Sequence, residues 1–547
     1  MYSLRLLITV VLFANTILFS ACSTSSFSYS EENKNLQRSQ QQVIAPGLNY
    51  LEIHKGQATG YFVLSSDIVS LEAANLLKLK LETFNATVAN SSEQTSQLVS
   101  VIKPVEKGPN GNDLGRLVTF GQFDTLKQAT AMQAELDAIG LHFKPTHSTQ
   151  RSAGAGKQQI SILELAPSVF EGQVISALAK DSVLDIQQTS KIAQNNAAVA
   201  AVNGGFFAFQ THQGLVGDPA GIAAVDGTLV SEAVNGRPAL LLSNTPALSL
   251  DILENVHTHL AMRIDEQQFQ ISGINRQAGK IFNCGQRNGD KTMTAIHDYV
   301  CSETDEIIIY NHYFGNLEVI LKEQQTFQFF LDHNNKVYFT PPLADSVLPK
   351  GHRLVSASGK YFNIFKQMVK STSRINITQR IWSDGGEVVL EKGMYIINGG
   401  PTLLNGGKTQ VSQRAQQGWD IAPVNIGTAA VDSRDEISQT EQADNSRVNF
   451  YQNWILQRHP RTAVGITETG TALFVVVYGR DPLLSIGASV SEMADIMKEL
   501  GAVKAINLDG GGSSVMVIEG QITGKPSDTN GERAVAEALL FIAVKKV

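Results

Sequence analysis

The residues Asn507-Leu508-Asp509-Gly510-Gly511-Gly512-Ser513-Ser514 join two predicted strands, 502–509 and 515–518. Because side chains alternate along a strand, Asn507 and Asp509 share a face that begins apolar and becomes polar at its carboxyl end. The three glycines let a ligand approach the backbone closely. A carboxylate, a carboxamide and two hydroxyls around such a turn predict a site for an anion or a sugar. The alternative is a glycine-rich hairpin whose Asp and Ser side chains satisfy only the turn backbone.

A helix is predicted immediately before these strands. Ser489 and Glu492 have the spacing of a capping box, in which each side chain binds the backbone N–H of the other residue. Gly501 supplies the stop signal at the end of the helix. Between them runs an apolar stripe at helical spacing, made of Val490, Met493, Met497 and Leu500.

This helix, strand and glycine-rich turn together resemble the signature of the phosphodiester glycosidase family, whose best-known member removes N-acetylglucosamine to uncover mannose 6-phosphate. Further segments resemble other blocks of the family in the same order, from Ala201 to Val544. They are Ala201-Val202-Asn203-Gly204-Gly205-Phe206-Phe207, Gly221 with Asp226-Gly227, Asp305 to Tyr310 with Phe314-Gly315, Asn398-Gly399-Gly400-Pro401 to Leu404, Arg458 to Gly465, Tyr478-Gly479-Arg480, and Pro526-Ser527 with Arg533.

The resemblance implies that residues 155–547 form one large, β-rich, mixed α/β domain. The fold class expected for the whole chain is α+β. Two features depart from the family pattern. Tyr478 stands where the family usually has Asp, so no catalytic role is assigned to it. Residues 275–304 and 371–392 look like elaborations that reshape the substrate cleft.

The resemblance also implies an activity, which is hydrolysis of the bond between a sugar's anomeric carbon and a phosphodiester oxygen. Such chemistry needs cations or N–H groups on the phosphate, and a carboxylate that assists the anomeric centre or activates water. Phosphate is already a moderately good leaving group, so strong general-acid help is less necessary than for an ordinary glycoside.

Three residues are the catalytic candidates. Asp509 is the first choice for the carboxylate, with turn capping or binding of a ligand hydroxyl as its alternatives. Arg461 is expected to bind the phosphate, because a guanidinium can bind its oxygens bidentately. His459 is a candidate proton donor near neutral pH, against a structural hydrogen bond.

A larger set is predicted to bind substrate. Arg480 and Arg533 are further phosphate candidates, and the asparagines followed by two glycines bind sugar hydroxyls or occupy left-handed turns. The serines lack an evident adjacent base, so they are predicted to be ligand donors rather than nucleophiles. The full set is Asn203, Gly204, Asn398, Gly399, Arg480, Asn507, Gly510, Gly511, Ser513, Ser514 and Arg533. No cofactor or metal is assigned, because the oxygen ligands of this segment lack EF-hand-like spacing.

Residues 1–21 are predicted to be an export signal. Arg5 precedes an apolar stretch that is shorter than a membrane span and ends in small residues. The residues before Cys22 resemble a bacterial lipobox, with Phe19 where Leu is usual. This resemblance implies a lipid anchor on Cys22, with Ser23 favouring the outer membrane and a domain facing the periplasm. An ordinary secretory signal is the alternative.

Residues 22–47 are rich in Ser, Asn, Gln and Glu, a composition that predicts a flexible tether. Beyond Cys22 the chain has two further cysteines, Cys284 and Cys301. In an oxidising compartment they predict a disulfide, worth about 3 kcal/mol through restriction of the unfolded chain. Zinc binding is the weaker alternative, because two cysteines do not supply four ligands.

Residues 48–150 predict a separate small domain with the order β-α-β-β-α-β, whose helices cover one face of a sheet and leave the other free. The predicted helices are 67–84 and 122–139. The segment Arg116 to Phe123, followed by Ala129, Leu136 and Gly140, resembles the second half of a sporulation-related repeat (SPOR) domain. That resemblance implies binding of peptidoglycan glycan strands. An unrelated α+β packing domain is the alternative.

Composition narrows the classes of function. The 44 lysines and arginines against 51 aspartates and glutamates give a net charge of −7, and no long basic run appears. Nucleic-acid binding is therefore not expected. The leading hypothesis is an envelope hydrolase of glycosyl phosphodiesters or related surface glycans. The alternatives are a non-catalytic glycan-binding scaffold and an enzyme acting on a neutral glycan.

Overall fold

A computed structural model describes residues 37–89, 98–105, 113–150, 155–284, 297, 300–322, 325–340, 347–410, 417–419 and 451–544. The predicted signal 1–21 and Cys22 lie outside these residues. Within the described ranges, no helix is long and apolar enough to cross a membrane.

An antiparallel eight-stranded sheet organises the large part of the chain. Its order is β1 (Gln37–Ala45), β2 (Leu48–Lys55), β7 (Gln158–Leu165), β30 (Ala472–Val477), β29 (Arg461–Thr467), β31 (Ala502–Asn507), β27 (Thr402–Asn405) and β28 (Lys408–Thr409). Both faces are buried. Along β7, for example, Leu163 and Leu165 enter one core while Ile160 and Ile162 enter the other, because successive side chains alternate.

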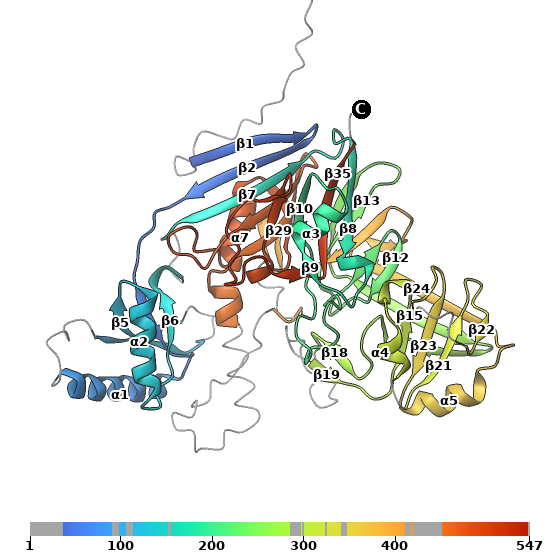
Figure 1. The fold of residues 1–547 in the computed structure, drawn as a ribbon, viewed down its shortest axis with the longest axis horizontal. Helices are drawn as coiled ribbons and strands as arrows, with labels where there is room; N and C mark the ends of the chain where they lie inside the picture. Colours follow the sequence, from blue (N-terminus) through green and yellow to red (C-terminus); the bar gives the residue numbers. More distant parts are fainter. Residues whose placement is uncertain are drawn as a thin grey trace, which may run out of the picture.

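Helix α7 (Val490–Glu499) covers one face of this sheet (Figure 1). A five-stranded sheet packs on the other face, with the order β33 (Gln521–Ile522), β32 (Met516–Ile518), β10 (Ala200–Asn203), β35 (Glu537–Ala543) and β8 (Gly172–Leu178). The capping box predicted at Ser489 and Glu492 is present in both directions. The predicted helix–strand–turn unit is therefore confirmed.

Three further sheets extend the domain beside this sandwich (Figure 1). The first has the order β12 (Thr228–Ser231), β11 (Ala223–Val225), β26 (Met394–Asn398), β13 (Ala239–Ser243), β14 (Ser249–Leu253). The second is β16 (Gln267–Gln270), β15 (His257–Ile264), β24 (Ile375–Ser383), β25 (Gly386–Val388). The third is β17 (Gly273–Ile274), β20 (Ile307–Tyr310), β23 (Arg353–Ala357), β21 (Phe327–Leu331), β22 (Val337–Tyr338), covered by α5 (Lys360–Met368). The described chain is thus mostly β, as predicted.

Smaller elements complete this part of the chain. Helices α3 (Thr189–Asn195) and α4 (Glu318–Leu321) are short, and β9 (Gln187–Gln188) pairs with β34 (Ala534–Val535). Strands β18 (Lys280–Phe282) and β19 (Val300–Ser302) form a separate two-stranded ladder.

The predicted tether and domain start need correction. Strand β1 lies within the predicted tether 22–47, and β2 begins at residue 48, where the small domain was expected to start. Both strands instead extend the large sheet, because β2 pairs with β7 along its whole length and buries Leu48, Tyr50, Leu51 and Ile53 in its cores. The small unit therefore begins after Lys55.

The small unit has the predicted element order: β3 (Phe62–Ser65), α1 (Leu71–Ala89), β4 (Ser100–Pro104), β5 (Arg116–Phe123), α2 (Leu126–Asp137), β6 (Lys144–His147). Its antiparallel sheet runs β4-β5-β3-β6. Leu64, Val118 and Phe120 pack under the helices. The SPOR resemblance stays a prediction.

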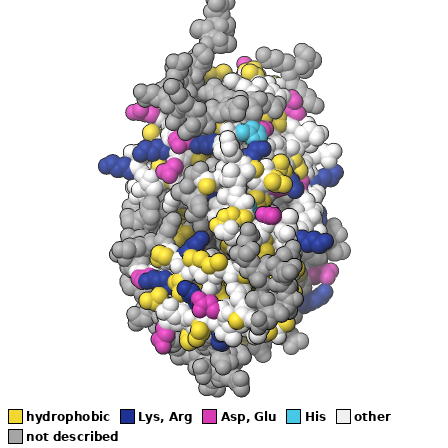
Figure 2. All heavy atoms as spheres, turned by 90° about the vertical axis from the view of Figure 1, so that its left-hand side faces the viewer, with side chains coloured by type: hydrophobic (Ala, Val, Ile, Leu, Met, Phe, Trp, Pro, Cys, Tyr) yellow, Lys and Arg dark blue, Asp and Glu magenta, His cyan; other side chains and the backbone are white. Residues whose placement is uncertain are grey.

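The opposite face of the small sheet was expected to be free, but it meets the large domain. Val63, Leu117 and Thr119 line a cavity of about 270 Å³ together with Gln452 and Leu456. The last two residues belong to a π-helical segment, Tyr451–Leu456. Figure 2 shows the left-hand side of the view in Figure 1, and the described surface there carries acidic and basic side chains interspersed rather than as a basic stripe.

Candidate active site

Antiparallel pairing brings the ends of three strands to one edge of the large sheet. Ala463 of β29 faces Asn507 of β31, and Arg461 of β29 faces Val477 of β30. The start of β29 therefore lies beside the ends of the other two strands. Arg461, Arg480 and Asp509 converge there, although they are distant in sequence.

A cavity of about 470 Å³ opens at this edge. It contains many of the predicted site residues, namely His459, Arg461, Arg480, Asp509, Gly510, Gly511, Ser513 and Arg533. The rest of its lining is largely aromatic, with Phe206, Phe207, Phe209, Phe282, His297, Asn453 and Trp454. The lining thus combines a carboxylate, arginines and aromatic rings.

Asp509 is half-buried at the mouth of the glycine-rich turn. Its Oδ1 accepts a 2.8 Å hydrogen bond from the N–H of Gly510, which fixes the carboxylate against the backbone. Nearby, the Oγ of Ser513 is buried and has no hydrogen-bond partner among the described residues. A buried hydroxyl without a partner is unfavourable, so its position at the cavity is suited to a bound ligand.

Arg480 and Arg533 lie over the glycines of the same turn. A Cβ at Gly511 would approach Arg480 Nη2 to 3.2 Å, and one at Gly512 would approach Arg533 Nη2 to 2.3 Å. The glycines therefore make room for both guanidinium groups. Burial first, and then the charge of Arg533, lower the pKa of Arg480. Two close, like-charged groups at a cavity favour an anionic ligand.

Asp528, which the sequence analysis missed, organises these arginines. Its carboxylate binds Arg533 through Nε–Oδ2 and Nη2–Oδ1 contacts of 2.7 and 3.1 Å, and lies 3.7 Å from Arg480 Nη1. The one local signal near Asp528 is Asn530-Gly531, a residue pair that predicts a turn.

Arg461 lines the cavity but also holds the neighbouring segment. Its Nε donates to the carbonyl of Ala488 at 3.0 Å, and its Nη2 donates to the carbonyls of Trp454 and Gln457. The guanidinium is almost fully buried. These contacts give Arg461 a positioning role for Trp454.

His459 does not fit the predicted role of proton donor near neutral pH. Burial first, and then the charges of Arg461 and Arg480, lower its pKa to about 3. Its Nε2 donates to the carbonyl of Asn453 at 2.5 Å, so Nδ1 is left as an acceptor for Arg480 at 3.4 Å. The neutral imidazole is therefore a hydrogen-bonding link between Asn453 and Arg480.

Asn203 lies outside the cavity, fully buried between the two stacked sheets. Its Nδ2 donates to the carbonyl of Asp509 at 2.8 Å, and its Oδ1 accepts from Thr462 Oγ1 and the N–H of Val515. Ser514, another predicted ligand, is also buried and lies within hydrogen-bond distance of the same Thr462 hydroxyl, at 3.1 Å. The buried side chains of Asn203, Thr462 and Ser514 therefore support the glycine-rich turn without lining the cavity.

Gly204 and the following glycine pack against a buried acid that the sequence analysis missed. Glu537 accepts hydrogen bonds from the N–H of Gly205 at 3.0 Å and from Ser176 Oγ at 2.7 Å. A Cβ at Gly204 would lie 2.5 Å from Glu537 Cγ. Burial raises the pKa of Glu537. No motif in the sequence singles out this residue.

Asn398 is also a supporting residue in the structure. Its side chain accepts from the N–H of Phe206 at 2.9 Å and donates to the carbonyl of Phe206 at 3.1 Å. Gly399 packs against Ile506 and the carbonyl of Asn507. Asn507 itself is fully buried, and its Nδ2 donates to the carbonyl of Leu508 at 2.5 Å. None of these three residues lines the cavity.

The predicted disulfide between Cys284 and Cys301 is confirmed, with the two Cα atoms 6.0 Å apart. It closes the β18–β19 ladder, and this elaborated region contributes Phe282 and His297 to the cavity. The expectation that residues 275–304 reshape the cleft is therefore consistent with the structure.

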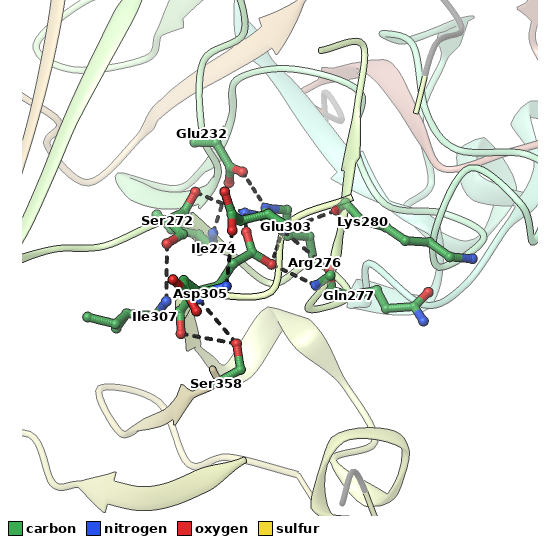
Figure 3. Close-up of polar contacts among 12 residues, drawn as sticks. Glu232, Ser272, Ile274, Arg276, Gln277, Lys280, Glu303, Asp305, Ile307 and Ser358 are labelled. Carbon is green, nitrogen blue, oxygen red and sulfur yellow. Dashed lines mark hydrogen bonds and ion pairs between the residues drawn. The ribbon is translucent and has the colours of Figure 1, made fainter. Parts of the chain in front are cut away.

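A buried ion network holds the base of this ladder (Figure 3). Arg276 binds Glu232 through Nε at 2.9 Å and Glu306 through Nη2, and its Nη1 donates to the carbonyl of Lys280 at 3.1 Å. Both neighbouring carboxylates also accept backbone N–H groups, Glu232 from Ile274 and Glu306 from Gly279.

Tyr478, the residue that stands where the family usually has Asp, packs in the core. Its hydroxyl contacts Thr523 Oγ1 at 3.0 Å and accepts from the N–H of Met516. Across the described residues, no three His, Cys, Asp or Glu side chains gather as a metal site would require.

Comparisons with known proteins agree with part of this interpretation. Residues 328–542 match the family model described as phosphodiester glycosidase. The matched range includes Asp509 and the arginines of the cavity, but not Asn203 or Phe206. Among curated proteins, "SPbeta prophage-derived uncharacterized protein YomE" of Bacillus subtilis is 39% identical over 82 residues. That match spans 15% of this chain and only 12% of the relative's length.

Among solved structures, the "Putative exported protein" from Burkholderia pseudomallei has a TM-score of 0.76 and 26% identity. The match covers 93% of this chain and 97% of that one. The auto-inhibited catalytic domain of zebrafish N-acetylglucosamine-1-phosphodiester alpha-N-acetylglucosaminidase has a TM-score of 0.32 and 15% identity, covering 83% and 86% of the two chains.

Proposed function

We propose that this chain is an exported hydrolase that cleaves the bond between a sugar's anomeric carbon and a phosphodiester oxygen. The observation that carries the proposal is the meeting of Asp509 with Arg480 and Arg533 in one cavity, inside the range that matches the phosphodiester glycosidase model. The arginines supply charge for the phosphate, and Asp509 supplies a carboxylate for the anomeric centre.

In the proposed reaction, water oxygen bonds to the anomeric carbon as the bond from that carbon to the phosphodiester oxygen breaks. The electron pair leaves with the phosphate, which becomes a monoester held by the arginines. Asp509 accepts the proton of the water or stabilises the oxocarbenium-like centre. His459 takes no part as an acid, because its only proton at neutral pH is donated to the Asn453 carbonyl.

The test uses purified protein without its predicted signal and a sugar phosphodiester such as an N-acetylglucosamine 1-phosphate diester, with wall polymers as further substrates. We expect release of free sugar and a phosphate monoester, and loss of turnover in Asp509→Asn. Asp251→Asn, at an exposed acid, is the matched control. Absence of turnover in the wild type on every substrate, with sugar phosphate bound equally by wild type and Asp509→Asn, would favour the scaffold alternative.

We further propose that the small unit binds peptidoglycan glycan strands in the cavity of about 270 Å³ that remains between the large domain and the sheet face opposite the helices of the unit. Hydroxyls and one cation surround the cavity there, contributed by Ser65, Lys103, Thr119, Thr146 and Ser148. Cosedimentation with isolated peptidoglycan tests this role, comparing wild type with Lys103→Ala. Lys127→Ala, on the helix side of the unit, is the control. Equal sedimentation of all three proteins at the level of a non-binding protein would contradict the proposal.

A lipid anchor at Cys22 is proposed on the sequence pattern alone. It places the protein at the envelope, on the periplasmic side of the outer membrane. Mass spectrometry of the mature N-terminus distinguishes a diacylglyceryl cysteine at position 22 from a free N-terminus produced by ordinary signal cleavage. Only the first result supports the anchor.

A further inference from the structure

Aromatic rings from separate segments form one wall of the cavity. We define this aromatic wall as Phe206, Phe282, His297 and Trp454, all of which line the cavity. Trp454 stacks on the buried Trp419, with ring centroids 4.9 Å apart and planes 21° apart. The rings of His297 and Phe206 lie 4.3 and 5.3 Å from the same Trp419 ring. Trp419 therefore supports three of the four rings, and Phe282 packs against the same hydrophobic core cluster.

This wall is held in place before any ligand binds. Asn398 fixes the backbone of Phe206 through two hydrogen bonds, and Arg461 binds the carbonyl of Trp454. The guanidinium of Arg237 lies 4.0 Å from the centroid of Trp419, on which the wall rests. Fixed rings lose little conformational entropy on binding, so they can contribute to affinity.

Asp509 connects the wall to the arginines. Its N–H donates to the carbonyl of Gly204 at 3.3 Å, two residues before Phe206. On its other side, the chain continues through Gly511 and Gly512, over which Arg480 and Arg533 lie. The backbone of Asp509 therefore joins the segment that carries Phe206 to the turn over which Arg480 and Arg533 lie.

A glycosyl phosphodiester has one group suited to the aromatic rings and one suited to the arginines of this cavity. Its anomeric carbon is a member of the sugar ring and carries the phosphodiester oxygen. If Asp509 acts at that carbon, the arginines face the phosphate and the aromatic wall faces the ring. A pyranose presents C–H groups on its ring faces, which pack on aromatic side chains, while its hydroxyls remain free for polar groups.

We propose that the aromatic wall binds the sugar ring and makes the glycosyl group, rather than the group beyond the phosphate, the recognised part of the substrate. This inference rests on the proposed function and adds specificity-determining residues to it. The region closed by the disulfide contributes to this recognition, because it supplies Phe282 and His297. Phe209 is a natural comparison residue, since its ring lies 6.0 Å from the guanidinium of Arg533, on the phosphate side.

Binding measurements separate the two halves of the site. The probes are inorganic phosphate, N-acetylglucosamine 1-phosphate, and a series of its diesters with alkyl groups of increasing length. Affinity is followed by tryptophan fluorescence in a Trp382→Phe background, which leaves Trp419 and Trp454 as the chain's remaining tryptophans. Calorimetry on the same proteins gives an independent constant.

In the wild type we expect the sugar phosphate to bind more tightly than inorganic phosphate. Phe282→Ala should weaken binding of the sugar phosphate by about three- to tenfold, the range of one aromatic contact, and leave phosphate affinity unchanged. Phe282→Tyr should restore most of the difference, and Phe209→Ala should not affect it. Phe282 is partly exposed, so these variants are expected to fold, which thermal unfolding verifies.

Two results would overturn the inference. One is equal binding of sugar phosphate and inorganic phosphate in the wild type. The other is a loss in Phe282→Ala that appears only with the diesters and grows with alkyl length, because the wall would then bind the group beyond the phosphate. A failure of the hydrolase proposal would give a different result. The wild type would then show no turnover, but it would still bind the sugar phosphate more tightly than inorganic phosphate, and this preference would still depend on Phe282.

Discussion

The side-chain amide of Asn203 donates a 2.8 Å hydrogen bond to the carbonyl oxygen of Asp509, and so joins the end of β10 to the candidate catalytic residue. Asn203 ends a strand of the five-stranded sheet, whereas Asp509 follows β31 of the eight-stranded sheet. The same asparagine accepts hydrogen bonds from Thr462 and Val515. The position of Asp509 therefore depends on a side chain that never reaches the cavity.

Asn203→Ala is expected to destabilise the fold as well as the site. It removes the side-chain partner of the Asp509 carbonyl and of the Val515 N–H, at about 1–3 kcal/mol for each such group and with incomplete additivity, while the Thr462 hydroxyl keeps Ser514 as a partner. Urea unfolding should show a loss of about 2–4 kcal/mol, and turnover should fall even where the protein remains folded. Asn195→Ala, at an exposed asparagine, should change stability by under about 0.5 kcal/mol. Normal stability of Asn203→Ala would contradict this bracing role.

Arg480→Ala is expected to weaken recognition of the phosphate. Charge-assisted contacts of this kind are worth about 1.5–3 kcal/mol, so kcat/KM should fall by about 10- to 100-fold. Arg480→Lys should restore only part of it, because an ammonium cannot reproduce the planar guanidinium. Kinetics on a sugar phosphodiester measure both effects. Arg263→Ala, at an exposed arginine paired with Glu266, is the control; an equal loss in that variant would indicate a general charge effect.

His459 makes a pH-dependent contribution to stability with a definite sign. Its folded-state pKa of about 3 lies below the ordinary value of 6.5, so the unfolded chain binds a proton in this window that the folded chain does not. The contribution is complete above about pH 6.5 and is lost as the pH falls toward 3. In His459→Gln, whose amide can still donate to Asn453, this part of the pH dependence should disappear.

Urea unfolding at pH 5 and pH 7.5 measures the prediction for His459. The wild type should lose stability relative to His459→Gln at the lower pH. A difference between the two proteins that is the same at both pH values would show that His459 titrates normally in the folded protein. We also expect kcat/KM of the wild type to show no ionisation from His459 between pH 5 and 8.

The sequence predicted those parts of the fold and of the site that depend on local patterns of residues. The capping box of Ser489 and Glu492 and the turn around Asp509 are specified by neighbours a few residues away. The element order of the small unit follows from periodicity. The disulfide follows from the cysteine count and the predicted compartment.

Other features depend on partners distant in the chain. Strand β1 has the polar composition of a tether, yet it pairs with β2, which in turn pairs with β7. Asn203 and Asn398 have the residue type of sugar ligands, but their amides meet backbone groups brought close by sheet stacking. Trp454 and Phe282 lie outside any recognised motif, and only the folded chain places them in one cavity.

Glu306→Gln tests the buried network at the base of the β18–β19 ladder. Glu306 is fully buried and binds Arg276. The Gln side chain carries no negative charge, so the buried positive charge of Arg276 would lose one of its two carboxylate partners. Breaking such a pair costs about 3–5 kcal/mol, which urea unfolding should detect. Glu266→Gln removes an exposed partner of Arg263 and should have almost no effect. A small loss in Glu306→Gln would mean that Glu232 alone compensates Arg276.

The disulfide of the same ladder should act on stability and on ligand binding together. A Cys284→Ser/Cys301→Ser double variant is expected to lose about 3 kcal/mol of unfolding free energy, because its unfolded chain is less restricted. It should also bind N-acetylglucosamine 1-phosphate more weakly, since Phe282 lies two residues before Cys284. Dithiothreitol should reproduce both changes in the wild type and add nothing in the double variant. A lower stability with unchanged sugar-phosphate affinity would show that β18 holds Phe282 without the disulfide, through the Arg276 network alone.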